Sequence, residues 1–118
     1  MSNGEFGKTS RLLNAADFQA VFKGAEYKVS NRHFLLLARV NMNGNPRLGL
    51  VVAKKNIRKA CSRNRIKRII RESFRQLPDF PALDTVVLVR HGTDQLDNPT
   101  LRRNLDSLWQ QLSLQATR

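Results

Sequence analysis

The side chains of this chain best suited to chemistry are the basic residues gathered between Lys54 and Arg75. The segment reads KKNIRKACSRNRIKRIIRESFR; ten of its 22 residues are Lys or Arg, and Glu72 is the one acid. Such groups bind phosphate oxygens, and arginine, which outnumbers lysine between Ile57 and Arg75, does so through paired hydrogen bonds. The segment therefore offers recognition of a polyanion, above all a nucleic acid.

The spacing of these residues predicts that the charge lies on one helix face. Asn64, Arg68, Arg71 and Arg75 recur every three or four residues, and Arg65 falls on the flank. Ordinary surface helices intersperse Glu with Lys, because like charges at this spacing repel one another. A bound polyanion would relieve the repulsion, so we favour this interpretation over a merely solvated face. Asn64 could bond phosphate or ribose, or hold the backbone of the first turns; its position favours the former.

Other chemistries find little support in the sequence. His33 and His91 are the two histidines, and no Cys/His cluster has the spacing of metal ligands. No Ser/His/Asp order or carboxylate pair stands out, so we expect no hydrolytic centre built from protein side chains. Cys61, the single cysteine, is interpreted as a small packing residue rather than a nucleophile.

The composition indicates one small, strongly basic domain. With 118 residues, 41% of them hydrophobic, the chain should fold around a modest core. Its net charge of +12 points to nucleic acid, an anionic membrane or an acidic protein as partner. One cysteine excludes an intramolecular disulfide and suits a reducing cytosol. The first residues, MSNGEFGKTS, contain no apolar signal region, and no apolar run approaches about 18 residues, so we expect neither secretion nor membrane insertion.

The first part of the chain predicts a helix followed by strands. Asn14 would cap a helix over AADFQAVFK that stops at Gly24. Residues 32–40 and 47–53 read as strands, and the turn formers NMNGNP between them predict a hairpin. A strand over 26–30 is indicated more weakly.

The second part predicts a basic helix, a buried strand and a last helix. The basic helix would cover 57–77, closed by Pro78 and Pro81, and the apolar run over 84–90 predicts a strand buried on both faces. Asn98 would cap the last helix, with Pro99 in its first turn. Its predicted core stripe comprises Leu101, Leu105, Leu108, Trp109 and Leu112.

This order of elements predicts an α/β (α+β) two-layer sandwich, with helices packed on one central sheet. Residues 1–10 read as a flexible tail, 11–114 as a single domain that binds nucleic acid and 115–118 as a short C-terminal tail.

The basic segment resembles the signature of the bacterial ribonuclease P protein subunit. NAADFQAVFK resembles the family's first helix, NRHF and RLGLVVAKK its strands, and LRRNLDSLW its last helix, so that the resemblance spans about residues 10–112. It implies a cytoplasmic protein that binds a catalytic RNA, one protein per RNA, together with the 5′ leader of precursor tRNA. The RNA would remove that leader with Mg²⁺, and the protein alone would hold no cofactor. The implied fold is ribosomal-protein-like, with a left-handed βαβ crossover, against the usual preference.

The resemblance also implies site residues. Binding of the RNA subunit falls to the central motif, to which the basic pattern adds its flanks: Arg58, Lys59, Arg63, Asn64, Arg65, Lys67, Arg68, Arg71 and Arg75. Binding of the leader falls to Arg11, Phe18, Phe22, Phe34, Lys54 and Lys55. Spacing alone predicts core packing for Phe18 and Phe22 equally well, and Phe34 could be core or cleft. Leu37 stands where some relatives have an aromatic, which puts that stacking contact in doubt.

Three other functions compete with this one. A structural RNA-binding protein of ribosomal type fits the composition equally well, but the RNRIKR motif and its distance from the paired phenylalanines favour the ribonuclease P subunit. A DNA-binding protein would need a helix-turn-helix or a dimer-forming element, and none is apparent. A nuclease acting alone would need the catalytic constellation that is missing.

Overall fold

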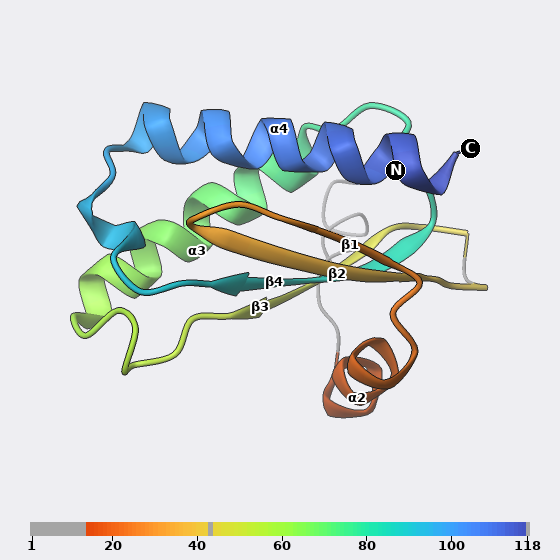
Figure 1. The fold of residues 1–118 in the computed structure, drawn as a ribbon, viewed down its shortest axis with the longest axis horizontal. Helices are drawn as coiled ribbons and strands as arrows, with labels where there is room; N and C mark the ends of the chain where they lie inside the picture. Colours follow the sequence, from red (N-terminus) through yellow and green to blue (C-terminus); the bar gives the residue numbers. More distant parts are fainter. Residues whose placement is uncertain (1–13, 43, 118) are drawn as a thin grey trace, which may run out of the picture.

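The structure, a computed structural model, describes residues 14–42 and 44–117. The elements run in the predicted order of helix, three strands, helix, strand and helix (Figure 1). They are α2 (Ala15–Gly24), β1 (Tyr27–Ser30), β2 (Phe34–Val40), β3 (Arg47–Val51), α3 (Ala60–Arg75), β4 (Leu83–Val89), the 3₁₀ helix η1 (Thr93–Gln95) and α4 (Asn98–Ala116).

The four strands form one sheet in the order β1-β2-β4-β3. β2 pairs antiparallel with both β1 and β4, whereas β3 pairs parallel with β4. The predicted hairpin of 32–40 with 47–53 is therefore wrong, because β4 lies between these strands. β4 is buried along nearly its whole length, which is the property of an inner strand. Asn41 bonds to Ala82 and Asp84 at the start of β4, and its Nδ2–H also donates to the carbonyl of Asn45 at 2.9 Å, so the segment after β2 is tied to β4.

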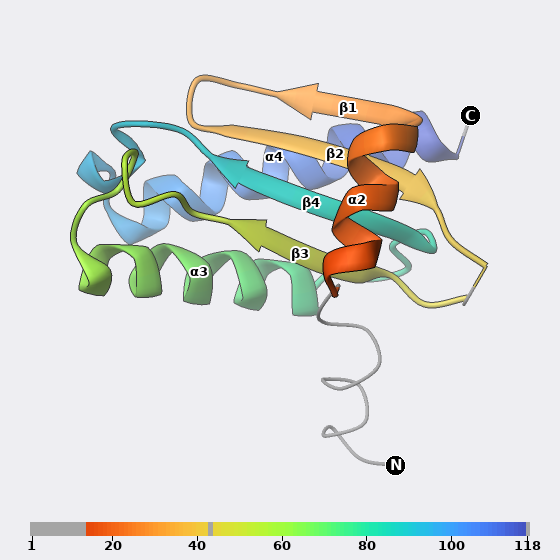
Figure 2. The same cartoon turned by 90° about the horizontal axis from the view of Figure 1, so that it is seen from below.

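The helices lie on both faces of the sheet. α3 and α4 pack together on one face, and α2 crosses part of the other (Figures 1 and 2). The connection β3-α3-β4 joins two parallel strands. Seen from the α4 side with these strands pointing up, β4 lies to the left of β3, so the crossover is left-handed, as the resemblance implied.

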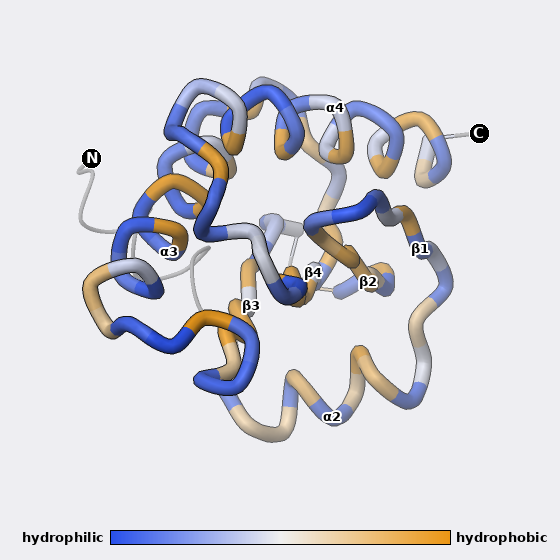
Figure 3. Tube along the Cα trace, turned by 60° about the vertical axis from the view of Figure 1, so that its left-hand side comes forward, coloured by the Kyte–Doolittle hydropathy of each residue, from blue (hydrophilic) through white to orange (hydrophobic). Residues whose placement is uncertain are grey.

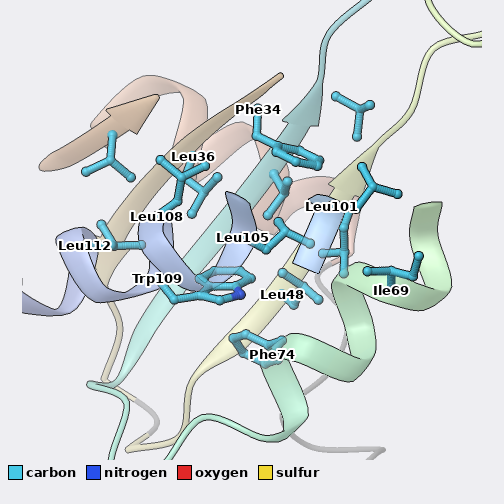
Figure 4. Close-up of a cluster of buried hydrophobic side chains, with 14 of the residues drawn as sticks. Phe34, Leu36, Leu48, Ile69, Phe74, Leu101, Leu105, Leu108, Trp109 and Leu112 are labelled. Atoms are coloured by element: carbon cyan, nitrogen blue, oxygen red, sulfur yellow. The ribbon is translucent and has the colours of Figure 1, made fainter. Parts of the chain in front are cut away.

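The main core fills the space between the sheet and the pair α3 and α4 (Figure 4). The predicted stripe of α4 is buried throughout. Trp109 packs against the rings of Phe74 and Phe80, and its Nε1–H donates to Ser73 Oγ at 2.9 Å. This bond satisfies the one polar atom of a fully buried indole, so it fixes α4 against α3 at a defined position.

The ends of the helices differ in part from expectation. Asn14 caps α2 in a capping box with Asp17, as predicted, but Gly24 is the last helical residue rather than a residue beyond the end. The cap of α4 is Asp97, whose Oδ1 accepts from the N–H of Thr100, and Asn98 is the first helical residue. α4 reaches Ala116, so residues 115 and 116 belong to the helix and not to a tail. The expected tail 1–10 lies outside the described residues.

Candidate RNA-binding surfaces

The helix α3 separates apolar and basic residues onto opposite sides. Ile66, Ile69, Ile70 and Phe74 are buried against the sheet and α4. Figure 3 shows the resulting alternation of hydrophobic and hydrophilic residues along α3. We call the outer side, which carries Asn64, Lys67, Arg68, Arg71 and Arg75, the basic face.

The cations of the basic face are available to a partner. Asn64, Arg68, Arg71 and Arg75 are exposed, and Lys67 is partly exposed. Within residues 14–42 and 44–117, no hydrogen bond or ion pair joins the four cations to another residue, and Glu72 pairs with none of them. No described residue therefore compensates their charge, which favours contact with phosphates.

Arg63 and Arg65 differ from this group because they bond within the protein. Arg63 Nη1–H donates to the carbonyl oxygens of Ile57 and Arg58, at 3.0 and 2.8 Å. Arg65 donates to Asn98 Oδ1 at 2.6 Å and to the carbonyl of Asp94 at 3.1 Å. Each guanidinium has five N–H groups, so both can still meet a phosphate. Sequence reasoning missed the structural half of their role, since no local pattern reveals contacts to these loops.

The loop between β3 and α3 carries four more of the predicted basic residues on a fixed backbone. Lys54, Lys55, Arg58 and Lys59 are all exposed. The loop is held by Ile57, which is fully buried, and by Asn56, whose Nδ2–H donates to the carbonyl of Val89 at 3.1 Å. The loop is thus anchored to the core, and its four cations are exposed to solvent.

The face of the sheet that bears α2 is only partly covered, and we call its uncovered part the open sheet face. Its floor consists of side chains from β2, β3 and β4 that are partly buried: Leu35, Leu37, Val51 and Leu88. A hollow of about 470 Å³ lies here, lined by Leu35, Val51, Asn56, Leu88, Val89, Arg90 and His91. Sequence reasoning did not select Arg90 and His91, although they stand at the end of the buried strand predicted over 84–90.

Phe18 and Phe22 of α2 border this face in different ways. Phe18 is partly buried beside the small apolar cluster of Val21 and Val86. Phe22 is 45% exposed. Their ring centroids are 6.3 Å apart with planes inclined by 29°. Phe18 accordingly combines packing with partial exposure, whereas Phe22 contributes little to the core and offers a free ring surface.

Three sequence-based assignments need comment. Phe34 is fully buried between the sheet and α4 (Figure 4), so the cleft role assigned to it is wrong. Side chains alternate along a strand, and Phe34 therefore points away from the face that carries Leu35 and Leu37. Cys61 is exposed on α3 and does not pack in the core. Arg11 lies outside the described residues.

The described residues contain no group of three His, Cys, Asp or Glu side chains that could hold a metal ion. In the same part of the chain, no helix combines the length and apolarity needed to cross a bilayer. The chemistry of the surfaces described above is thus that of exposed cations, aromatic rings and an aliphatic floor.

Comparison with known proteins agrees with this arrangement. The sequence profile of the Ribonuclease P family matches residues 6–113. The ribonuclease P protein component of Chromohalobacter salexigens is 50% identical over 95% of this chain and 88% of that protein; the one of Pseudomonas aeruginosa is 47% identical over 95% and 84%.

Solved structures give the same result at the level of the fold. The RNase P protein of Staphylococcus aureus superposes with a TM-score of 0.79 at 31% identity, covering 86% of this chain and 94% of that one. The RNase P protein of Thermotoga maritima superposes with a TM-score of 0.74 at 34% identity, covering 86% and 96%. The family profile spans most of the chain, and both the relatives and the solved structures carry the same name. This chain belongs to the bacterial ribonuclease P protein family.

Proposed function

We propose that this subunit of ribonuclease P binds the catalytic RNA through the basic face and the 5′ leader of precursor tRNA at the open sheet face. It would thereby assist endonucleolytic removal of the leader in the cytoplasm, with one protein per RNA. The observation that carries the proposal is the set of exposed cations on α3 that have no partner in the described residues. Such a row of exposed cations favours the binding of a phosphate backbone.

The two proposed surfaces suit different parts of an RNA. The basic face is a rigid helix with closely spaced cations, which matches folded RNA with a high density of phosphates. The open sheet face combines an aliphatic floor with Phe18 and Phe22 at one side and Lys54 and Lys55 at another. Aromatic rings stack on any base, and lysines neutralise the backbone, so this surface suits a single strand with little sequence preference.

The proposed role assigns no bond-breaking step to the protein. Mg²⁺ would be held by the RNA subunit, in keeping with the side chains described here, whose chemistry is to bind and orient phosphates and bases. The contribution of the chain to the reaction is then affinity: it raises the occupancy of the complex between catalytic RNA and precursor.

Reconstitution tests the proposal directly. The protein is mixed with a bacterial ribonuclease P RNA and a 5′-extended precursor tRNA at low Mg²⁺, and release of the leader is followed. We expect cleavage that needs both components and that protein alone does not produce. If the protein bound both RNAs but left cleavage unchanged, the chain would instead be a structural RNA-binding protein.

A further inference from the structure

The position of α2 over the sheet depends on few apolar contacts. α2 has ten residues, and among them Val21 alone is fully buried, facing Val86 of β4. Isolated helices of this length are unstable in water, so tertiary contacts must fix where this one lies. Since Phe18 and Phe22 belong to α2, the same contacts determine where their rings stand above the floor.

A group of charged residues beneath α2 supplies a second attachment. Arg47 of β3 donates from Nε and Nη2 to the two carboxylate oxygens of Asp84 on β4, at 2.8 and 2.7 Å. Asp84 is 5% exposed and also accepts from Asn41 Nδ2–H at 2.8 Å. The hydrogen bond to Asp84 is the main cause that raises the pKa of Arg47 above its usual value. The guanidinium is therefore charged and fixed in orientation by a two-point contact.

The same guanidinium reaches α2. Arg47 Nη2 lies 3.3 Å from Asp17 Oδ1, while Asp17 Oδ2 accepts from the backbone N–H of Asn14 at 3.1 Å. One carboxylate thus joins the cap of α2 to the sheet, immediately before Phe18 in the chain. Near the middle of α2, Arg39 Nη1–H donates to the carbonyl of Ala20 at 3.4 Å, a longer and weaker contact.

We propose that Arg47 and Asp17 are positioning residues for the leader: held by Asp84, Arg47 binds Asp17 and thereby sets the height and tilt of α2, and with them the rings of Phe18 and Phe22. This inference rests on the proposed leader site. The Arg47 bridge, defined as Asp17, Arg47 and Asp84, touches no RNA itself and acts through the placement of the two rings. It explains why a buried carboxylate and its arginine lie beneath α2, which has fewer buried residues than α3 or α4.

Asp17→Asn tests the bridge, because the asparagine keeps an oxygen for the N–H of Asn14 but loses the charge that faces Arg47. Replacing Arg47 itself would strand the buried Asp84 and could unfold the chain. Asn14→Ala is the matched control, since it removes the cap and leaves the bridge intact. Asp17→Glu is a second control, because it keeps a carboxylate at a position where capping boxes favour Glu. Each variant is assembled with ribonuclease P RNA and titrated with two precursors, one with a leader of several nucleotides and one with a single-nucleotide leader.

We expect Asp17→Asn to weaken binding of the long-leader precursor roughly two- to fivefold, which is the range of a partly exposed ion pair. Binding of the short-leader precursor and of the RNA subunit should not change. Asn14→Ala and Asp17→Glu should bind the long leader like the unmodified chain. Combining Asp17→Asn with Phe22→Ala, an exposed site that should not affect folding, should give less than the sum of the separate losses, because both act on the same contact.

The possible results distinguish a failure of the Arg47 bridge from a failure of the proposed leader site. Unchanged long-leader binding by Asp17→Asn, with a clear loss for Phe22→Ala, would overturn the bridge and leave the leader site standing. Equal losses of binding with both precursors, or additive losses in the double variant, would mean that the bridge only stabilises the fold. Either result would overturn the positioning role as well. If Phe22→Ala and Phe18→Ala both bound the long leader normally while folded, the proposed leader site itself would fall.

Discussion

At the scale of single residues, the structure divides the arginines of α3 into two groups that their sequence does not distinguish. Arg68, Arg71 and Arg75 have no partner among the described residues, whereas Arg63 and Arg65 bond loops of their own chain. The first group should act on affinity for RNA alone. The second should affect both affinity and the shape of the neighbouring loops.

Arg68→Ala should weaken binding of the RNA subunit and reduce its salt dependence. If roughly six phosphates are contacted, log K falls with log salt at a slope near −5, and removing one contact reduces that slope by about one. Arg102→Ala is the matched control, because it removes the same charge from a residue that bonds Asp106 and Gln76. Filter binding across a salt series measures both. Identical slopes for the two variants would mean that overall charge, not the basic face, sets the affinity.

Phe22→Ala should weaken binding of the leader with little effect on folding, because the ring is 45% exposed. Loss of one stacked base costs about 1–3 kcal/mol, equivalent to roughly five- to 150-fold in Kd. The loss should appear in the holoenzyme with a long-leader precursor and vanish with a single-nucleotide leader. Thermal unfolding of the free variant provides the control for stability. A loss of equal size for both leaders would place Phe22 outside the leader site.

At the scale of elements, local signals in the sequence predicted the helices and strands well, and the pairing of strands poorly. The cap of α2, the stripe of α4 and the burial of β4 all follow from patterns within a few residues. The hairpin prediction failed because the turn formers of residues 41–46 also suit a connection that passes the end of an inserted strand. Which strand inserts depends on the parallel crossover through α3, a long-range contact that local patterns do not contain.

The candidate site likewise has a part that local sequence patterns predict and a part that they do not. Charge spacing predicted the basic face, and alternation along β2 could have excluded Phe34 once the inner face of the sheet was known. The Arg47 bridge could not be foreseen, because it joins residues that are 30 and 37 positions apart. Such contacts appear only when the sheet order is known.

The N-terminal cap of α4 makes a prediction about pH. Two hydrogen bonds from Thr100 lower the pKa of Asp97 below its usual 3.8; the one from the hydroxyl has the larger effect and the one from the backbone N–H the smaller. The charges of Arg103 and Arg65 act in the same direction. The folded state thus favours the ionised carboxyl. Its contribution to stability is complete above pH 3.8 and disappears as pH falls through the lower pKa of the folded protein.

Asp97→Asn keeps a good capping residue and removes this titration. We expect the variant to be less stable than the unmodified chain at neutral pH, with a difference that shrinks below pH 3.8. Fluorescence of Trp109, the one tryptophan and fully buried, reports unfolding at each pH. A difference that stays constant down to the lowest pH would show that the charge of Asp97 does not contribute.

At the scale of the whole molecule, the folded chain holds far more positive charge than it neutralises. Its 21 Lys and Arg face nine Asp and Glu, and two of those acids are engaged by Arg47 beneath α2. Self-repulsion of this kind destabilises a compact state and is relieved by bound anions. The free protein should therefore be less stable than the size of its core suggests, and binding of RNA should stabilise the folded state.

Sulfate provides a measurable substitute for the phosphates of RNA. An anion that binds the folded state alone stabilises it by RT ln(1 + [L]/Kd), about 1.4 kcal/mol at ten times Kd, which for a domain of this size raises Tm by about 5–10 °C. Chloride at equal ionic strength separates screening from binding. The double variant Arg68→Ala with Arg71→Ala should lose most of the sulfate effect, because it removes adjacent cations of one face, whereas Arg102→Ala with Arg103→Ala, on α4, should keep it. If both double variants responded to sulfate like the unmodified chain, the anions would act through general exclusion from the surface, and the basic face would not be the site where charge limits stability.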